Sequence, residues 1–294
     1  MSYIPASRRA WSKLDEYAGP RAGPSERIIS VTSLVAPPRI VRLTALHRAE
    51  MPPSDPGSDT WALLGTAVHA ALERAAELSE TPPLLIERRE ETQVSGWTLS
   101  GQIDVLEADG TLIDYKVTSA WSVSDGRQGK GEWASQLNVL KWLLERAGAA
   151  PRGLIKSLAV WCICRDWSAS QAARDENYPQ SQEVAIPIPV WPEDETFRFI
   201  TERIALHEAA RTVLPECTPA ERWAKGGGYA VMRSRKAMRA ERIFERREDA
   251  ERYLAEALAG KGFVEDRPGK SVRCESYCRV ADFCSIRQNH LDKR

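Results

Sequence analysis

Two acids and a lysine lie close together in the middle of the chain, within runs of apolar and β-branched residues. Asp114 and Lys116 stand two positions apart in the segment LIDYKVTS, and Asp104 precedes them in SGQIDVLE. Side chains two positions apart in a strand project from the same face, so the acid and the amine are neighbours there. Two carboxylates beside an amine can hold a divalent cation and act on a phosphodiester bond.

The turn between the two acidic segments determines which residues lie opposite each other. We predict that residues 108–110 form a three-residue hairpin loop, because its last residue is the glycine that a left-handed position requires. This register places Asp104 opposite Asp114 and Gln102 opposite Lys116. Directly opposed side chains have Cβ atoms about 4.5–5.5 Å apart, so the two carboxylates would repel each other unless a cation lay between them.

A two-residue Asp-Gly turn is the alternative, and it would place Tyr115 opposite Asp104 and break the site. We favour the three-residue loop because it leaves one continuous apolar face on the hairpin, formed by Ile103, Val105, Ile113, Tyr115 and Val117. Oxygen ligands suit Mg²⁺ or Mn²⁺ better than zinc. Lys116 would then orient the attacking water or offset charge in the transition state; the competing interpretation is a surface Asp-Lys pair on a half-exposed strand.

The hydrophobic periodicity predicts the elements that must position these side chains. Helical spacing is found over 61–80, 131–148, 192–214 and 248–260. Strand patterns are found over 83–94, 97–107, 110–119 and 157–167, and the basic segment 229–244 reads as a hairpin. The order predicts an α/β or α+β core with a C-terminal appendage. We expect an N-terminal loop and helical segment (1–60), the core (61–215), and a basic hairpin and helix module with cysteines (216–294).

Four segments carry a more specific pattern: GTAVHAALE (65–73), SGQIDVLE (100–107), IDYKVTS (113–119) and ASQLNVLKW (134–142). Their order and spacing resemble the motifs of RecB-like exonucleases, in the CRISPR-associated and AddB-type branch of the PD-(D/E)XK nuclease superfamily. The matching residues are Gly65 and His69 of the G-x-x-x-H helix, Gly101 and Asp104 of the G-x-x-D strand, Asp114 and Lys116 of the (D/E)-x-K strand, and Gln136 of the Q-x-x-x-Y helix. Leu140 stands where the last motif has tyrosine, which weakens any inference about how that helix meets DNA.

The resemblance implies a restriction-endonuclease-like core, in which helices flank a central mixed sheet, and a DNA exonuclease that requires Mg²⁺ or Mn²⁺. Such an enzyme would act at DNA ends or on single strands, in recombination, repair or phage DNA processing. The implied catalytic residues are His69, Glu87, Asp104, Asp114, Lys116 and Gln136, with Glu87 matching an additional acid of some members. The implied metal ligands are His69, Asp104, Asp114 and the backbone carbonyl of Val117. The alternatives are a non-cleaving DNA-binding or assembly subunit and a structure-specific or RNA endonuclease.

Six cysteines in a chain of this kind indicate thiols or metal ligands more than a disulfide framework. The set Cys217, Cys274, Cys278 and Cys284 resembles the four-cysteine [4Fe-4S] site of several RecB-like nucleases. In those relatives the first cysteine precedes the G-x-x-x-H helix, whereas here no cysteine precedes Cys162, so Cys217 would take its place. Zinc and free thiols are the alternatives. Cys162 and Cys164 alternate along an apolar strand and are predicted to be core residues.

The distribution of charge gives a weaker indication of a nucleic-acid partner. Lys plus Arg (41) balance Asp plus Glu (41), so no global field attracts nucleic acid, although the segment from Glu221 onward is net basic. The glycine-rich segment 124–133 carries Arg127 and Lys130, which together with Gln136 we predict to contact DNA; a flexible surface loop is the alternative. No apolar run approaches the 18 or so residues of a membrane span, so we expect a cytoplasmic protein in a bacterial or phage-infected cell.

Overall fold

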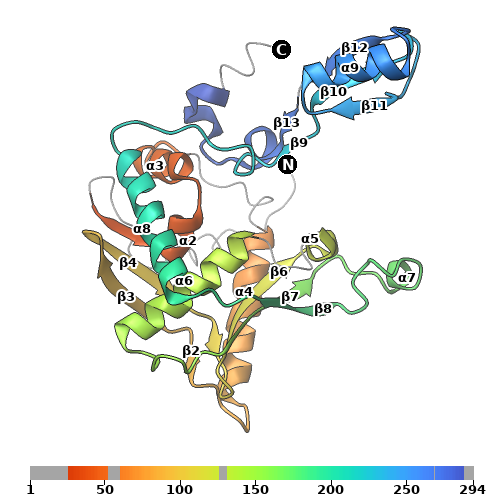
Figure 1. Cartoon of the computed structure of the whole chain (residues 1–294). Coiled ribbons are helices and arrows are strands. Elements are labelled where there is room, and N and C mark those ends of the chain that lie inside the picture. Colours follow the sequence, from red (N-terminus) through yellow and green to blue (C-terminus); the bar gives the residue numbers. More distant parts are fainter. Residues whose placement is uncertain (1–25, 52–59, 126–130, 268, 288–294) are drawn as a thin grey trace, which may run out of the picture. The chain divides into compact units, whose positions relative to one another are not determined.

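The computed structural model describes residues 26–51, 60–125, 131–267 and 269–287 of the chain (Figure 1). It divides into two compact units, Met1–Val213 and Leu214–Arg294. The first unit holds every candidate residue of the metal site, and the second holds the four cysteines of the proposed cluster. Within the described residues, no helix is both long and apolar enough to cross a membrane.

A five-stranded mixed sheet is the centre of the first unit. Its strand order is β2-β5-β6-β7-β8, in which β6 and β7 are parallel and the other neighbours are antiparallel. The strands are β2 (Leu85–Ile86), β5 (Val105–Leu106), β6 (Thr111–Thr118), β7 (Ser157–Cys164) and β8 (Glu183–Ile188). A second sheet has the order β1-β4-β3, formed by β1 (Ile28–Ser30), β4 (Trp97–Gln102) and β3 (Arg89–Val94).

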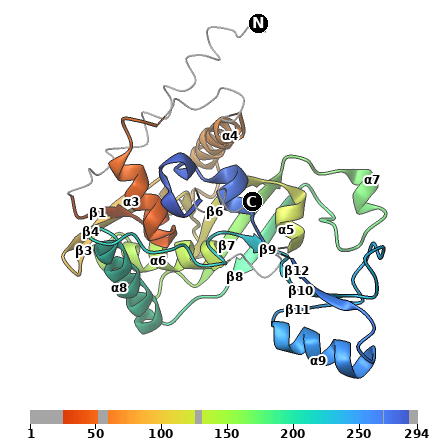
Figure 2. The same cartoon turned by 90° about the horizontal axis from the view of Figure 1, so that it is seen from above.

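Helices cover both faces of the central sheet, which confirms the predicted mixed α/β class. The helices of the first unit are α2 (Val31–Val35), α3 (Pro38–Leu46), α4 (Thr60–Glu77), α5 (Ala120–Asp125), α6 (Gly131–Ala147), α7 (Ala169–Ala172) and α8 (Glu193–Ala209). Helix α6 packs on both sheets, and its leucines are among the most buried side chains. Asp114 of β6 contacts α6, whereas its neighbour Tyr115 contacts α4. Successive residues of a strand point to opposite faces, so α4 and α6 flank β6 from opposite sides (Figure 2).

The second unit contains the predicted basic hairpin. Strands β10 (Gly228–Met232) and β11 (Arg242–Phe244) pair antiparallel, and β12 (Phe263–Arg267) completes a sheet of order β11-β10-β12 on which α9 (Arg247–Ala257) packs. The short strands β9 (Ala224–Lys225) and β13 (Lys270–Ser271) form a separate pair. Short irregular helical turns follow over Arg273–Tyr277 and Ala281–Phe283.

The predicted hairpin register is confirmed, but the predicted strand 97–107 is wrong as a single element. Val105 pairs with Ile113 and Leu106 with Leu112, and Gly110 adopts a left-handed φ of 87°, as a three-residue loop requires. The predicted strand is interrupted at residues 103–104, and its two parts, β4 and β5, belong to different sheets. Gln102 therefore pairs with Arg89 of β3 and not with Lys116.

Candidate metal centre and active site

Asp114 lies near the middle of β6 and is buried, with only 5% of its surface exposed. Its Oδ1 atom accepts hydrogen bonds from Lys116 Nζ and Gln136 Nε2, both at 3.0 Å. The Lys116 ammonium also forms an ion pair with the buried Oδ2 at 2.7 Å, and no other donor among the described residues bonds this oxygen. Burial outweighs the attraction of Lys116 and raises the pKa of Asp114 to about 6.

Asp104 lies at the point where β4 ends and β5 begins. Because β5 pairs with β6 only through Val105 and Leu106, the next backbone amide of β6 on that edge has no strand partner. The Asp104 side chain replaces the missing strand, since its Oδ2 accepts the Tyr115 N–H at 2.6 Å. This bond fixes the Asp104 carboxylate at the open edge of β6, next to the buried Asp114.

His69 reaches the same edge from α4. Its Nε2 lies 3.1 Å from the Tyr115 carbonyl oxygen, and its Nδ1 lies 3.4 Å from Asp104 Oδ1 and 3.9 Å from Glu87 Oε1. Hydrogen bonding to Asp104 and then Glu87 raises the pKa of His69 to about 10, so without a metal the ring is a cation between two acids. A metal ion bound through this ring would displace its proton, because only neutral imidazole ligates.

Glu87 joins this group because of an unusual backbone turn between β2 and β3. Its φ of 45° is left-handed, which is rare for a residue with a Cβ, and its N–H donates to the Asp104 carbonyl at 2.8 Å. Gln102 Nε2 donates to the Glu87 carboxylate. The turn therefore directs Glu87 toward His69, with its carboxylate held from the other side by Gln102.

The residues fit a divalent cation on the evidence of their donor atoms. His69, Glu87 and Asp104 each offer a ligand atom, and these atoms lie within 4.8 Å of one another. Two carboxylates with one imidazole form a mainly hard donor set, as Mg²⁺ and Mn²⁺ prefer. Asp114 stands outside this group, and its buried Oδ2 is paired with the Lys116 ammonium. The structure thus adds Glu87 to the centre of the ligand group and sets Asp114 slightly apart, held by Lys116 and Gln136.

Val117, Leu140, Arg127 and Lys130 complete the set of positions that the sequence singles out. Val117 follows Tyr115 by two positions, so its carbonyl faces the same edge as the Tyr115 carbonyl, and its role as a ligand stays a prediction. Leu140, which replaces the motif tyrosine, is a core residue with 3% exposure. It packs so closely against Gly101 that a Cβ added to this glycine would lie 2.7 Å from the Leu140 side chain. Arg127 and Lys130 lie outside the described residues.

Two residues that orient the site are missing from the set that the sequence predicts. Tyr115 uses its backbone N–H for Asp104 and its carbonyl for His69, and Gln102 holds Glu87. A backbone role leaves no signature in residue type, although the position of Tyr115 between Asp114 and Lys116 is a usable signal. The expected pairing of Gln102 with Lys116 is wrong, and that error hides its role beside Glu87.

The four cysteines of the proposed cluster all lie in the described part of the second unit, and their sulfur atoms do not form a preassembled metal site there. The group of His69, Glu87 and Asp104 is the one set of three or more metal-ligating residues that the described part of the chain brings within 4.8 Å. Burial is the largest cause that raises the pKa of the Cys274 thiol, and the nearby Cys278 and Cys284 raise it further. The three thiols are therefore close enough to interact electrostatically. Cys162 and Cys164 are fully buried core residues, as predicted.

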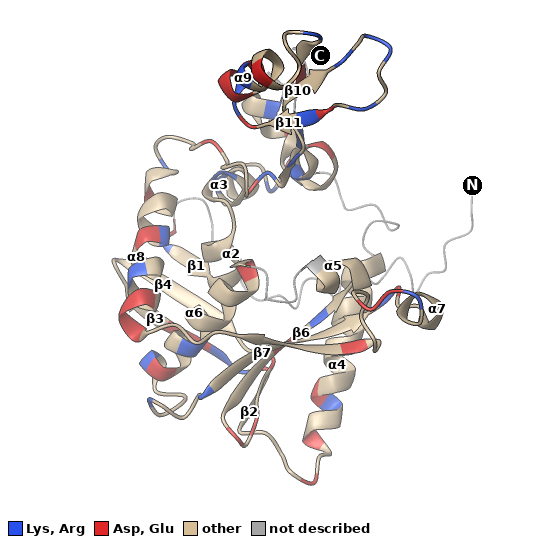
Figure 3. Ribbon diagram, turned by 45° about the vertical axis from the view of Figure 1, so that its right-hand side comes forward, with Lys and Arg blue, Asp and Glu red and all other residues tan. Residues whose placement is uncertain are grey.

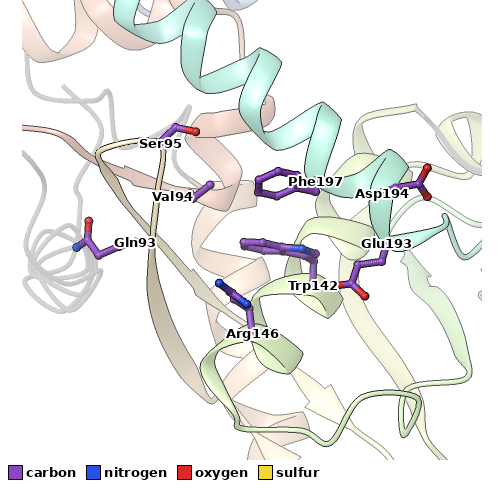
Figure 4. Close-up of a pocket in the computed structure, with 8 residues that line it drawn as sticks. All are labelled: Gln93, Val94, Ser95, Trp142, Arg146, Glu193, Asp194 and Phe197. Carbon is purple, nitrogen blue, oxygen red and sulfur yellow. The ribbon is translucent and has the colours of Figure 1, made fainter.

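A separate pocket of about 700 Å³ contains none of these candidate residues (Figure 4). It lies between the β3-β4 turn, α6 and α8, and the Trp142 and Phe197 rings stack in it with centroids 6.0 Å apart. We therefore do not assign the catalytic chemistry to this pocket.

Comparison with known proteins finds weak similarity to solved structures. No protein-family model and no curated protein matches the chain. The protein named SSO0001 is similar at 22% identity and a TM-score of 0.46, over 69% of this chain and 88% of that one. An alkaline exonuclease from Laribacter hongkongensis, LHK-Exo, is similar at 13% identity and a TM-score of 0.38, over 63% of this chain and 90% of that one. Both similarities are weak, so the function proposed below rests on the residues of this chain.

Proposed function

We propose that this chain is a metal-dependent nuclease that hydrolyses phosphodiester bonds of DNA, at ends or on single strands. The observation that carries the proposal is the pair of the buried Asp114 with the partly exposed Lys116, beside the ligand group of His69, Glu87 and Asp104. Burial of the ionised Asp114 carboxylate lowers stability, as its raised pKa shows, so packing does not explain this residue. Acids whose pKa is shifted in this way, clustered with an amine and an imidazole, are typical of catalytic sites.

Each residue of the site has a role that follows from its contacts. A divalent cation bound there would polarise a phosphate oxygen and lower the pKa of a bound water. His69, Glu87 and Asp104 would hold it, and Asp114 would supply a further oxygen ligand. Each of these four residues is fixed by backbone or side-chain contacts, so the site is organised before substrate binds.

Lys116 is the residue that we propose to act on the water and the phosphate. Its ammonium contacts the buried carboxylate, and its side chain is 30% exposed, so solvent reaches part of the residue. An ammonium has three N–H donors, and Asp114 engages only part of them. The remaining donors would orient the attacking water and offset the negative charge that develops on the phosphate.

Gln136 is a positioning residue in this proposal. Its amide donates to Asp114 Oδ1 from the first turns of α6, on the side of the carboxylate that Lys116 also contacts. Together with Lys116, whose ammonium lies 2.7 Å from Oδ2, Gln136 fixes the orientation of the Asp114 carboxylate.

The test is a nuclease assay on end-labelled single- and double-stranded DNA and RNA with Mg²⁺ or Mn²⁺. We expect the parent protein to cut DNA and Lys116→Ala to lose at least about a hundredfold in rate, as expected for loss of transition-state charge stabilisation. Lys156→Ala is the matched control, because Lys156 is an exposed lysine of the same unit. Cleavage by Lys116→Ala at the parental rate would show that the site is assigned wrongly.

Product length in the same assay separates the finer proposals. Mononucleotides or short products that accumulate from one labelled end indicate an exonuclease, whereas internal fragments indicate an endonuclease. Cleavage of RNA alone would favour the RNA endonuclease, and tight DNA binding without cleavage would favour the non-cleaving subunit.

We also propose that Cys217, Cys274, Cys278 and Cys284 hold a [4Fe-4S] cluster. Support comes from their spacing and from the electrostatic interaction of Cys274 with Cys278 and Cys284. Iron and sulfide content and the visible absorption of anaerobically purified protein test this proposal. A colourless protein with one zinc ion per chain, or with no metal, would contradict it.

A further inference from the structure

The first part of α4 has a surface that packing does not explain. None of the 18 residues of the helix is buried, although its composition is apolar. Trp61 is 54% exposed and Leu64 is 37% exposed. No Lys, Arg, Asp or Glu occurs in the helix before Glu73, and these charged residues lie in its C-terminal part (Figure 3). Solvated helices normally carry such residues on the exposed side, so this surface indicates contact with something else.

Gly65 lies in the middle of this surface, where the fold does not require a glycine. Among the described residues, a Cβ added at this position would meet nothing within 4 Å, and the backbone φ of Gly65 is not left-handed. Glycine in a helix interior is less stable than alanine, because it loses more conformational freedom on folding. The described residues leave the space next to Gly65 open, and their packing gives no reason for a glycine there.

The position of Gly65 relates this open space to the metal centre. His69 follows Gly65 by four residues and Trp61 precedes it by four, so the three lie along one side of α4 at one-turn intervals. The distance along the helix from Trp61 to His69 is about 12 Å at roughly 1.5 Å per residue. A ligand that extends from the metal centre along α4 therefore crosses Gly65 and reaches Trp61.

A cation lies at the far end of this path. The Arg165 guanidinium stacks over the Trp61 ring, with its central carbon 4.5 Å from the ring centroid. The backbone N–H of Arg165 donates to the Thr118 carbonyl at the end of β6, two residues beyond Lys116. The exposed Arg165-Trp61 pair is thus attached to the same strand that carries Lys116.

We propose that the side of α4 formed by Trp61, Gly65 and His69, together with Arg165, binds an unpaired nucleic-acid strand next to the scissile phosphate. The sugar-phosphate backbone passes over Gly65, where a side chain would obstruct it, and a base stacks on the Trp61-Arg165 pair. Aromatic and guanidinium planes accept any base, so binding has little sequence preference. The proposal rests on the nuclease function above and narrows its substrate to strands with unpaired nucleotides at the site.

The test measures binding of labelled single-stranded and duplex oligonucleotides by fluorescence anisotropy, with EDTA present so that cleavage does not interfere. We expect Gly65→Ala to keep or raise the melting temperature and still weaken single-strand binding at least about fivefold. Trp61→Ala should weaken it about tenfold or more, since stacking is lost, with duplex binding less affected. Phe197→Ala is the control, because Phe197 is a similarly exposed aromatic residue (47%) outside this surface.

The outcomes separate this inference from the nuclease proposal. Parental affinity in both Gly65→Ala and Trp61→Ala would overturn the inference even if the protein cleaves DNA. A lower melting temperature for Gly65→Ala would also overturn it, because the fold would then need the glycine. A protein that cleaves nothing but loses single-strand affinity in Gly65→Ala would support the binding surface and refute the nuclease. If Trp61→Ala does not fold, Gly65→Ala alone decides.

Discussion

Replacing Asp114 by asparagine should make the metal-free protein more stable and inactive at the same time. The carboxylate is buried, and its pKa rises from 3.8 to about 6 on folding. At about 1.4 kcal/mol per pKa unit, keeping Asp114 ionised in the folded state costs about 3 kcal/mol at neutral pH. Asparagine has nearly the same shape without the charge, so Asp114→Asn should recover up to about this amount.

The pH dependence of this effect has a definite sign. Because the folded-state pKa is above the unfolded value, the ionised carboxyl destabilises the fold fully above about pH 6. As the pH falls from about 6 toward 3.8, the folded protein takes up the proton first, and the disadvantage of the parent disappears. The stability difference between Asp114→Asn and the parent should therefore shrink over this range.

Thermal unfolding in EDTA at about pH 7.5 and about pH 4.5 measures the effect, and a nuclease assay with Mg²⁺ runs in parallel. Each kcal/mol gained should raise the melting temperature by about 2–4 °C. Asp109→Asn is the matched control on the same hairpin, because Asp109 is exposed and hydrogen bonding to Thr111 lowers its pKa. That variant should be slightly destabilised. The reasoning is refuted if Asp114→Asn melts no higher than the parent at the higher pH, or if the difference does not change with pH.

Three further substitutions test separate contacts. Gln136→Ala should lower the cleavage rate about tenfold and the free energy of unfolding by about 1 kcal/mol, because it removes one hydrogen bond to Asp114. Steady-state kinetics and urea unfolding measure these effects. Unchanged kinetics would exclude a positioning role for Gln136. Glu87→Gln should weaken Mn²⁺ binding at least about tenfold in titration calorimetry, since it removes one charged ligand, and parental affinity would exclude Glu87 from the site. Gly101→Ala should cost about 1–3 kcal/mol in urea unfolding, because its Cβ would lie within 2.9 Å of three buried side chains; a neutral result would mean that the core yields easily.

Local patterns in the sequence are sufficient to predict most helices and strands and the register of the hairpin between β5 and β6. The helical periodicity of α4 and α6 and the alternation of β7 depend only on near neighbours along the chain, so these segments are predicted with small errors at their ends. Gly110 determines the hairpin register, because a three-residue loop ending in glycine gives the observed left-handed turn. That register, continued by one residue, brings Asp104 next to Asp114.

The arrangement of the site depends on contacts that no local pattern encodes. The break at residues 103–104 divides one apparent strand between two sheets, and β4 packs against α6 at Gly101, where an added Cβ would lie within 2.9 Å of Leu140 and Leu143. Asp114 is buried because α6 covers that face of β6, although the residue types favour the opposite face as the apolar one.

Residue type and spacing therefore determine which side chains can form a catalytic group and in which order they come along the chain. The tertiary structure decides which of them meet. The left-handed turn at Glu87 and the backbone groups of Tyr115 bring His69, Glu87 and Asp104 together at the open edge of β6. Such contacts join residues far apart in sequence through backbone atoms that every residue shares, so the sequence holds no specific sign of them.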